Sequence, residues 1–442
     1  MLSWLRHQPV SVAAIGLLIL VPLLKLQAPR GIREQSGDFG KALVRLIRHA
    51  RLIQSFEVDP TQSVPQLWQQ RFGRELANSR WQQSSGQRWW MAWTDEGAAL
   101  LVLLNTTKPG QPELHFADEL HQTSYNQNVS DSNPSLSKLE LDCLNRLSTT
   151  TAVQWNRSAL ISIAGSTAAL LDSASNGCLS LSLEEDRLRF SGPVGSQSLS
   201  EAPDQRFTAG GQAFAPATKS MRQHASGEQS LLRLSSREAA SLLSVLASRP
   251  MLRDQLETRY GVTAAMLQTL LDAPMQLSVR PVKAGPFKAG LQCRLHVPLR
   301  LKADLERHLN TIATVLRDRD LRSKPLTIDP LKGESVGVGL LWMEGDQAVG
   351  GWSLHRIQDD LVLQLSLGQP PFIEPEPDRT PDGVELAMHL LPSALAEIGW
   401  LSQGWPDLIR RSSNLELVMA PIRTRSEAEP SWSRLQGQLS LR

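Results

Sequence analysis

The sequence contains few of the residues that build small cross-linked or metal-bound domains. Its three cysteines, Cys143, Cys178 and Cys293, lie far apart, and none belongs to a CxxC pair. This spacing excludes a zinc ribbon, a thioredoxin-type redox pair and a framework of several disulfides, but it is compatible with one bridge. An odd number of thiols does not identify the compartment of the protein.

The sequence also lacks an excess of charge of either sign. Lys and Arg number 46 and Asp and Glu number 44, which gives a formal net charge of +2. Such a balance creates no overall field that attracts nucleic acid or an acidic substrate. We therefore expect no nucleic-acid partner.

The common signatures of catalysis and nucleotide binding are missing as well. The sequence contains no GxSxG, HExxH or Walker loop, and no GxGxxG that opens a helix. The glycine-rich stretch at 337–351 reads as strand, turn and strand, so it does not form a phosphate-binding loop. We assign no catalytic residue and no cofactor, and the missing motifs favour a protein that is not an enzyme.

Length and composition point to an ordinary globular chain. With 442 residues, 41% hydrophobic and 20% charged, the protein is long enough for two or three domains. Neither wholesale disorder nor a protein with several membrane spans fits these values.

The amino terminus carries the clearest signal. An apolar run from Val10 to Leu24 follows a short basic start, and its length fits a membrane helix or the core of a signal peptide. No A-x-A site follows, so residues 1–30 are predicted to be an uncleaved, single-pass anchor. The count of basic residues on the two flanks places the folded part in the cytoplasm. A short tail before the first apolar helix instead favours export of the residues that follow it. We therefore expect the folded part on the extracytoplasmic side, in the periplasm or a lumen.

Residues 36–57 are predicted to form a basic amphipathic helix beside the membrane. Apolar residues recur at helical spacing, namely Phe39, Leu43, Leu46, Ile47, Ala50 and Ile53. The other face carries the candidate membrane-surface residues Lys41, Arg45, Arg48 and Arg51. This face is compatible with binding to anionic lipid and equally with an ordinary helix that caps a domain.

Residues 88–104 read as a hairpin that turns at Asp95-Glu96-Gly97. Trp89, Met91 and Trp93 point to one face and Trp90 and Ala92 to the other, which indicates strands inside a sheet covered on both sides. The indoles are candidates for a ligand platform, a membrane belt or core. We favour core, because aromatic residues in strands usually bury.

A similar order of elements recurs later in the chain. A helix over 301–316 precedes a hairpin that turns at Glu344-Gly345-Asp346, and each hairpin is followed by a proline-bearing loop, a strand running into a helix and a closing strand pair. We predict an α+β fold with two similar, mainly antiparallel sheet units and packed helices after the membrane helix. The first copy covers 60–196, a flexible linker covers 197–231, and the second unit, with extra helices, covers 232–442.

Candidate metal ligands occur at His115, Asp118, Glu119 and His121, but their spacing does not place the histidines on one helical face. The acidic stretch at 374–385 lacks the ligand order of a calcium loop. We expect no metal site. The other histidines considered, His296, His308, His355 and His389, are predicted to be structural.

Three features determine the layout of the chain: the single anchor, the tryptophan-bearing hairpins, and the closing strands RLRFSGPVG and RLQGQLSLR. This layout resembles that of uncharacterised single-anchor membrane proteins of cyanobacteria. The resemblance implies no activity and no site residues. We expect a membrane-anchored, non-enzymatic scaffold or binding protein of the bacterial envelope or photosynthetic membrane. Its expected partners are membrane lipid, through the anchor, and other proteins. The alternatives are an anchored hydrolase and a lipid-handling module.

Overall fold

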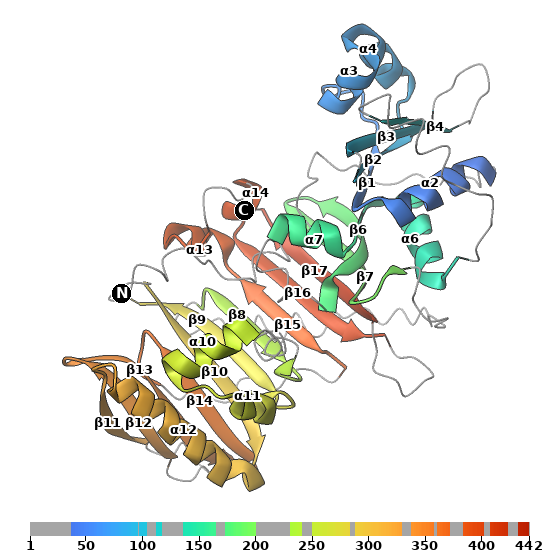
Figure 1. The fold of residues 1–442 in the computed structure, drawn as a ribbon. Helices are drawn as coiled ribbons and strands as arrows, with labels where there is room; N and C mark the ends of the chain where they lie inside the picture. Colours follow the sequence, from blue (N-terminus) through green and yellow to red (C-terminus); the bar gives the residue numbers. More distant parts are fainter. Residues whose placement is uncertain are drawn as a thin grey trace. The chain divides into compact units, whose positions relative to one another are not determined.

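The computed structural model describes residues 37–95, 97–103, 112–116, 136–164, 173–199, 230–240, 250–282, 288–328, 337–357, 360–371, 383–401, 407–422 and 432–441. The chain divides into two compact units. Unit 1 comprises Met1–Gly210 with Pro421–Arg442, and unit 2 comprises Gly211–Ala420. Figure 1 labels their helices and strands.

Unit 1 contains antiparallel strands in the order β4-β3-β2-β1-β5-β6-β7-β17. The strands are β1 (Leu52–Glu57), β2 (Arg88–Thr94), β3 (Gly97–Leu103), β4 (Pro112–Phe116), β5 (Thr151–Trp155), β6 (Asn176–Glu184), β7 (Arg187–Gly195) and β17 (Trp432–Ser440). The helices are α2 (Gly37–His49), α3 (Gln66–Phe72), α4 (Arg74–Gln83), α6 (Lys138–Thr149) and α7 (Arg157–Ala164).

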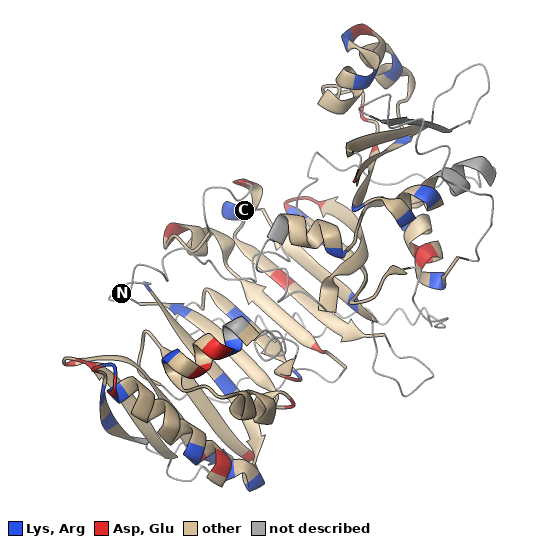
Figure 2. Cartoon of the chain, viewed as in Figure 1, with Lys and Arg blue, Asp and Glu red and all other residues tan. Residues whose placement is uncertain are grey.

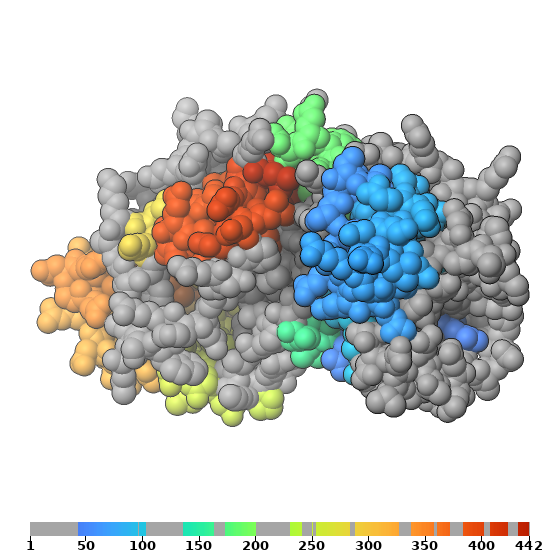
Figure 3. All heavy atoms as spheres, turned by 90° about the horizontal axis from the view of Figure 1, so that it is seen from above, coloured from blue at the N-terminus to red at the C-terminus, as the bar shows by residue number. Residues whose placement is uncertain are grey.

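One face of β1–β3 is covered by α3 and α4 through a cluster of aromatic rings. Trp89 of β2 stacks on Phe56 of β1 with ring centroids 4.4 Å apart. Trp68 of α3 and Trp81 of α4 meet Trp89 edge to face at 6.0 and 6.1 Å. Much of the blue part of the chain forms a continuous surface in Figure 3. Trp89 is 3% exposed, so its prediction as core is confirmed.

The opposite face of the same strands packs against α2 and α6. Trp90 is 1% exposed on this side, and its indole Nε1 donates to the carbonyl oxygen of Leu147 at 2.9 Å. A disulfide between Cys143 of α6 and Cys178 of β6 lies in this core. The predicted hairpin between β2 and β3 and its burial on both faces are confirmed.

Helix α6 begins with a capping box and is the element to which α2 is attached. The hydroxyl of Ser137 accepts from the backbone N–H of Glu140, whose carboxylate accepts from the N–H of Ser137. The guanidinium of Arg48 donates to both oxygens of that carboxylate, at 2.9 and 3.2 Å. Because Glu140 is 2% exposed, this ion pair is largely shielded from water.

Unit 2 contains antiparallel strands in the order β11-β12-β13-β14-β10-β9-β8-β15-β16. The strands are β8 (Leu232–Ser236), β9 (Met275–Pro281), β10 (Ala289–Pro298), β11 (Arg322–Ile328), β12 (Gly337–Glu344), β13 (Gln347–Ile357), β14 (Asp360–Leu367), β15 (Leu386–Leu390) and β16 (Asn414–Pro421). The helices are α10 (Pro250–Tyr260), α11 (Ala264–Leu270), α12 (Lys302–Arg317), α13 (Pro392–Glu397) and α14 (Asp407–Arg410).

Helices α10, α11 and α12 lie over one face of these strands (Figure 1). The helix predicted over 301–316 is confirmed as α12, which starts at Lys302 and buries Leu305, Leu309, Ile312 and Leu316. Buried apolar residues such as Leu295, Val297 and Leu363 alternate along the strands with polar residues that point to the other face. The predicted turn between β12 and β13 is confirmed, with Gly345 at a φ of +60°.

The predicted fold class is wrong. The strands belong to one antiparallel sheet and not to two similar sheet units. The two units share an order of elements but differ in how their strands pair. In unit 1, β1 pairs with β2, the first strand of the meander that follows it. In unit 2, β10 pairs with β14, the last strand of the meander that follows it. The closing strand β17, predicted in the second copy, pairs with β7 of unit 1.

The predicted helix over 36–57 ends earlier than expected. Helix α2 stops at His49, and Leu52–Glu57 forms β1 between β2 and β5. Ala50 and Ile53 continue the apolar spacing of the helix, and both are buried in the same core as Leu43 and Leu46. Helix and strand bury the same face at this junction, so the helical periodicity continued past the real end of the helix.

Among the described residues, no helix is both long enough and apolar enough to cross a membrane. The predicted anchor at 1–30 lies outside them, as does nearly all of the predicted linker.

Candidate functional site

Buried polar side chains gather on one face of unit 2. Strand β10 presents Gln292, Arg294 and His296 at alternate positions, and these pair in register with Ser366, Gln364 and Val362 of β14. On the next strand, β13, Ser353 pairs with Gln364 and His355 pairs with Val362. Alternate residues of a strand share a face, so these residues lie together. We define the polar face of unit 2 as Gln292, Arg294, His296, Ser353, His355, Gln364 and Ser366.

The polar face is buried, which is unusual for the polar side of an antiparallel sheet. Ser353, Gln364 and Ser366 are 0% exposed, and His355 is 3% exposed. Arg294 is 4% exposed and carries a charge. Polar groups are rarely buried in such number, so the polar face is the strongest candidate for a site.

A polar row extends from this face across neighbouring strands. The residues that face one another in register, from β14 through β10, β9, β8 and β15 to β16, are Ser366, Gln292, Ser278, Arg233, His389 and Glu416. Figure 2 shows basic residues within the strands of unit 2 and an acidic residue within β16. The row therefore ends in a carboxylate beside His389, far from β13.

Some polar atoms on the face have no hydrogen-bond partner among the residues that the structure describes, and three of them belong to hydroxyl or imidazole groups. They are Nδ1 of His355, Oγ of Ser353 and Oγ of Ser366. A buried polar group without a partner costs about 1–3 kcal/mol of stability. Such groups are rare in native proteins and call for a specific explanation, such as a ligand or an ordered water.

Burial and charge set the protonation of the site. Burial, together with the smaller effect of the positive charges of Arg294 and His296, lowers the pKa of His355 to about 4. The imidazole is therefore neutral at neutral pH. Burial also lowers the pKa of His389, against the opposing effect of Glu416.

Glycines flank the two hydroxyls. Gly339 of β12 pairs with Ser353, and Gly351 of β13 pairs with Ser366. A Cβ at Gly339 would lie 2.6 Å from the carbonyl oxygen of Trp352, and one at Gly351 would lie 2.4 Å from that of Leu340. Close approach of the backbones thus requires glycine at both positions. A Cβ at Gly351 would also lie 3.1 Å from Cδ of Pro371, which packs against this position.

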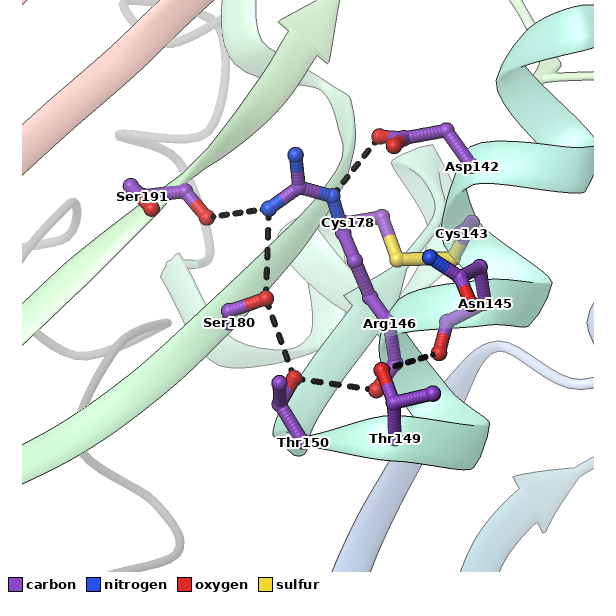
Figure 4. Close-up of polar contacts among 9 residues, drawn as sticks. All are labelled: Asp142, Cys143, Asn145, Arg146, Thr149, Thr150, Cys178, Ser180 and Ser191. Carbon is purple, nitrogen blue, oxygen red and sulfur yellow. Dashed lines mark hydrogen bonds and ion pairs between the residues drawn. A yellow bond between two sulfur atoms is a disulfide. The ribbon is translucent and has the colours of Figure 1, made fainter. Parts of the chain in front are cut away.

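A second polar cluster, in unit 1, has a structural explanation (Figure 4). Arg146 of α6 donates to Asp142 at 2.7 Å, to the hydroxyl of Ser180 at 3.1 Å and to the carbonyl oxygen of Ser191 at 3.0 Å. The cluster lies beside the disulfide that joins α6 to β6. Because its contacts connect the end of α6 to β6 and β7, we interpret it as a brace.

The predicted membrane-surface residues do not form one free basic surface. Arg48 binds the buried Glu140, and Arg51 forms an exposed ion pair with Asp95. Arg45 is half-buried, and the side chain of Lys41 lies outside the described part. A role of these residues at a membrane stays a prediction.

The candidate metal ligands fall mostly outside the described residues. His115 lies in β4, where only the backbone is described, and 117–121 and 372–382 are not described. Within the described ranges, no group of three His, Cys, Asp or Glu side chains could hold a metal ion.

The polar face was not predicted from the sequence. Its signal was present as alternation within β10, where Gln292, Arg294 and His296 are separated by apolar residues. Such alternation is typical of a half-exposed strand, so it indicates a solvated face and gives no hint of burial. Comparison with protein-family models, curated proteins and solved structures finds no match to this chain.

Proposed function

We propose that the protein is a membrane-anchored, non-enzymatic binding protein whose ligand site is the polar face of unit 2. The observation that carries the proposal is the set of buried atoms without a partner on Ser353, Ser366 and His355. A bound molecule that supplies hydrogen bonds at this place removes the penalty of leaving them unpaired.

The protonation state of His355 favours binding over catalysis. A serine nucleophile needs a neighbouring base whose pKa lies near the operating pH. Ser353 and His355 lie on the same strand, but the pKa of His355 is lowered to about 4. Such an imidazole is a weak base, which argues against an anchored hydrolase at this site.

We place the folded part on the extracytoplasmic side, in the periplasm or a lumen, with residues 1–30 as its anchor in an envelope or photosynthetic membrane. The apolar run from Val10 to Leu24 supports the anchor. The disulfide between Cys143 and Cys178 supports the location, because structural disulfides persist in oxidising compartments and are rare in the cytosol.

Native mass spectrometry of the full chain, extracted gently from membranes, tests binding. We expect a co-purifying small molecule that is lost when Ser353 and Ser366 are both changed to Ala. The matched control is Ser182→Ala, at an exposed position of β6 in unit 1. A ligand retained by the double variant, or labelling of Ser353 by a fluorophosphonate, contradicts the proposal.

Protease added to intact spheroplasts tests the location. We expect cleavage of the folded part without lysis, and sedimentation with membranes that is lost when residues 1–34 are deleted. Protection until lysis contradicts the extracytoplasmic location. Continued sedimentation of the truncated chain after a salt wash contradicts anchoring by the first segment alone.

A further inference from the structure

We propose that the edge strand β11 of unit 2 binds an extended, acidic segment of a partner protein. The segment adds one strand antiparallel to β11 and places acidic side chains beside Arg322 and Lys324. This inference concerns a protein partner, and it does not depend on a ligand at the polar face.

The backbone of β11 has one free side. The strand lies at one end of the strands of unit 2 (Figure 1), and among the described strands it pairs only with β12. One row of its N–H and C=O groups therefore points away from the sheet. Proline has no N–H and fits an edge strand when its nitrogen faces away from the neighbouring strand. The outward row thus belongs to Ser323, Pro325 and Thr327, and an extended chain can pair with it.

Two unpaired cations lie along this edge. Arg322 and Lys324 are alternate residues of β11, so they share a face of the sheet, and both are exposed. Neither forms an ion pair with a residue that the structure describes. On neighbouring strands, opposite charges that face each other are stabilising and like charges are destabilising. The edge therefore favours an acidic strand over a basic one.

Apolar residues on the same face specify a third position of the partner. Leu326 is the next alternate residue after Lys324, and it is half-buried, as is Leu341 of β12, which pairs with Lys324. An apolar side chain opposite Leu326 removes this surface from water. The described strand pairs of unit 2 are antiparallel, so the segment carries, in chain order, an apolar residue and then two acidic residues at alternate positions.

Lys324 and Pro325 also restrict what can pair with this edge. Lysine and proline on edge strands are typical of sheets that avoid pairing with further copies of the same chain. Because Pro325 removes one N–H from the outward row, a partner needs side-chain attraction in addition to its backbone bonds. The two cations supply this attraction to an acidic segment alone, so the features that protect the edge also select its partner.

Fluorescence anisotropy of labelled peptides, titrated with the full chain, tests the proposal. The acidic probe is Thr-Leu-Thr-Glu-Thr-Glu-Thr, which has Leu and both Glu on one face of a strand. The lysine probe has Lys in place of both Glu. The adjacent probe, Thr-Leu-Thr-Glu-Glu-Thr-Thr, keeps the composition but turns one Glu to the other face. We expect the lysine probe to bind about tenfold more weakly than the acidic probe, and the adjacent probe about threefold more weakly.

Charge reversal at the edge should exchange the preference. The Arg322→Glu and Lys324→Glu double variant should weaken the acidic probe about tenfold and bind the lysine probe more tightly than the unchanged protein does. The matched control is the Lys288→Glu and Arg300→Glu double variant, which makes the same change in net charge at exposed positions outside β11. An equal loss in both variants, or equal binding of the acidic and adjacent probes, means attraction by net charge alone and overturns the proposal.

Hydrogen exchange locates the bound peptide. At saturation, the acidic probe should slow exchange in Arg322–Ile328 and leave Asn414–Pro421 unchanged. Binding without protection of β11, or no binding of the acidic probe, overturns the added strand. Dimers of the full chain that dissociate in the Arg322→Glu and Lys324→Glu variant, as measured by sedimentation, would show that a second copy occupies the edge and would overturn the acidic partner.

Discussion

At the scale of single residues, two buried serines provide a direct comparison. Ser353 has a hydroxyl without a partner among the described residues, so Ser353→Ala removes a penalty. In β1, the hydroxyl of Ser55 donates to the carbonyl oxygen of Thr150 at 2.9 Å and accepts from the N–H of Ala152 at 2.8 Å. Without ligand, we expect Ser353→Ala to leave the free energy of unfolding unchanged or raise it by up to ~1 kcal/mol, and Ser55→Ala to lower it by about 1–3 kcal/mol.

Urea unfolding of the protein and both variants measures this difference, since both serines are 0% exposed and lose the same atoms. A loss at Ser353 as large as that at Ser55 would show that its hydroxyl has a partner in the folded protein, and would remove the main support for a ligand site.

The buried imidazole of His355 should make stability depend on pH. Its folded pKa of about 4 lies below the ordinary value of 6.5. Between these values the unfolded chain binds a proton that the folded chain does not bind, so folding loses stability as the pH falls from about 6.5 to 4. The full contribution is present above pH 6.5, and its loss amounts to about 3 kcal/mol.

We expect His355→Gln to lose less stability than the unchanged protein over that pH range, as measured by urea unfolding at pH 7, 5.5 and 4. His389 titrates in both proteins and its contribution cancels in the difference. Parallel pH profiles would mean that water or a counter-charge reaches His355.

At the scale of elements, the ion pair between Arg48 of α2 and Glu140 of α6 should contribute to the free energy of unfolding mainly because its carboxylate is buried. Arg48→Ala leaves the carboxylate of Glu140, at 2% exposure, without its guanidinium. Removing one partner of a buried pair typically costs 3–5 kcal/mol. Because Arg48 itself is 25% exposed, we expect the lower end, about 3 kcal/mol, in the free energy of unfolding.

The matched control is Arg51→Ala, two positions after α2 ends. Arg51 is 46% exposed and its partner Asp95 is 75% exposed, so its loss should cost less than about 1 kcal/mol. Equal costs for the two variants, by urea unfolding, would contradict the idea that α2 is held to α6 through Glu140.

Elements with a strong local signal were predictable. The stripe of α12 and the two acidic turns match their sequence patterns because each is determined within about four residues. The end of α2 was not predictable, since Ile53 continues the apolar spacing of Leu43 and Leu46 into a strand that buries the same face. The burial of His355 and Ser353 was not predictable either. Alternation of polar and apolar residues along a strand indicates which face a side chain occupies, but it does not indicate whether that face is covered.

At the scale of the whole molecule, the order of elements proved a poor guide to topology. Pairing between distant strands, such as β10 with β14 or β17 with β7, depends on long-range contacts that leave no local pattern. The closing segment RLQGQLSLR reads as the last strand of a second copy but forms the neighbour of RLRFSGPVG. Their similar alternation fits two strands that share one sheet as well as it fits two copies of one unit.

The disulfide should stabilise unit 1 without an equal effect on unit 2. It joins Cys143 and Cys178 across 35 residues, and closing a loop of that length contributes about 3–4 kcal/mol by restricting the unfolded chain. We expect the Cys143→Ala and Cys178→Ala double variant to increase hydrogen exchange in peptides from α6, β5 and β6. Peptides from β9 and β10 should change little, because local stability follows local contacts.

Cys293→Ala is the matched control in unit 2, where burial raises the pKa of the thiol to about 12 and keeps it unreactive. Hydrogen exchange read by mass spectrometry, peptide by peptide, separates the two units in one experiment. If the double variant increases exchange equally in β9 and β10, the bridge stabilises the chain as one cooperative whole. If it changes neither unit, the bridge is not formed in the native protein, and its support for an oxidising compartment falls with it.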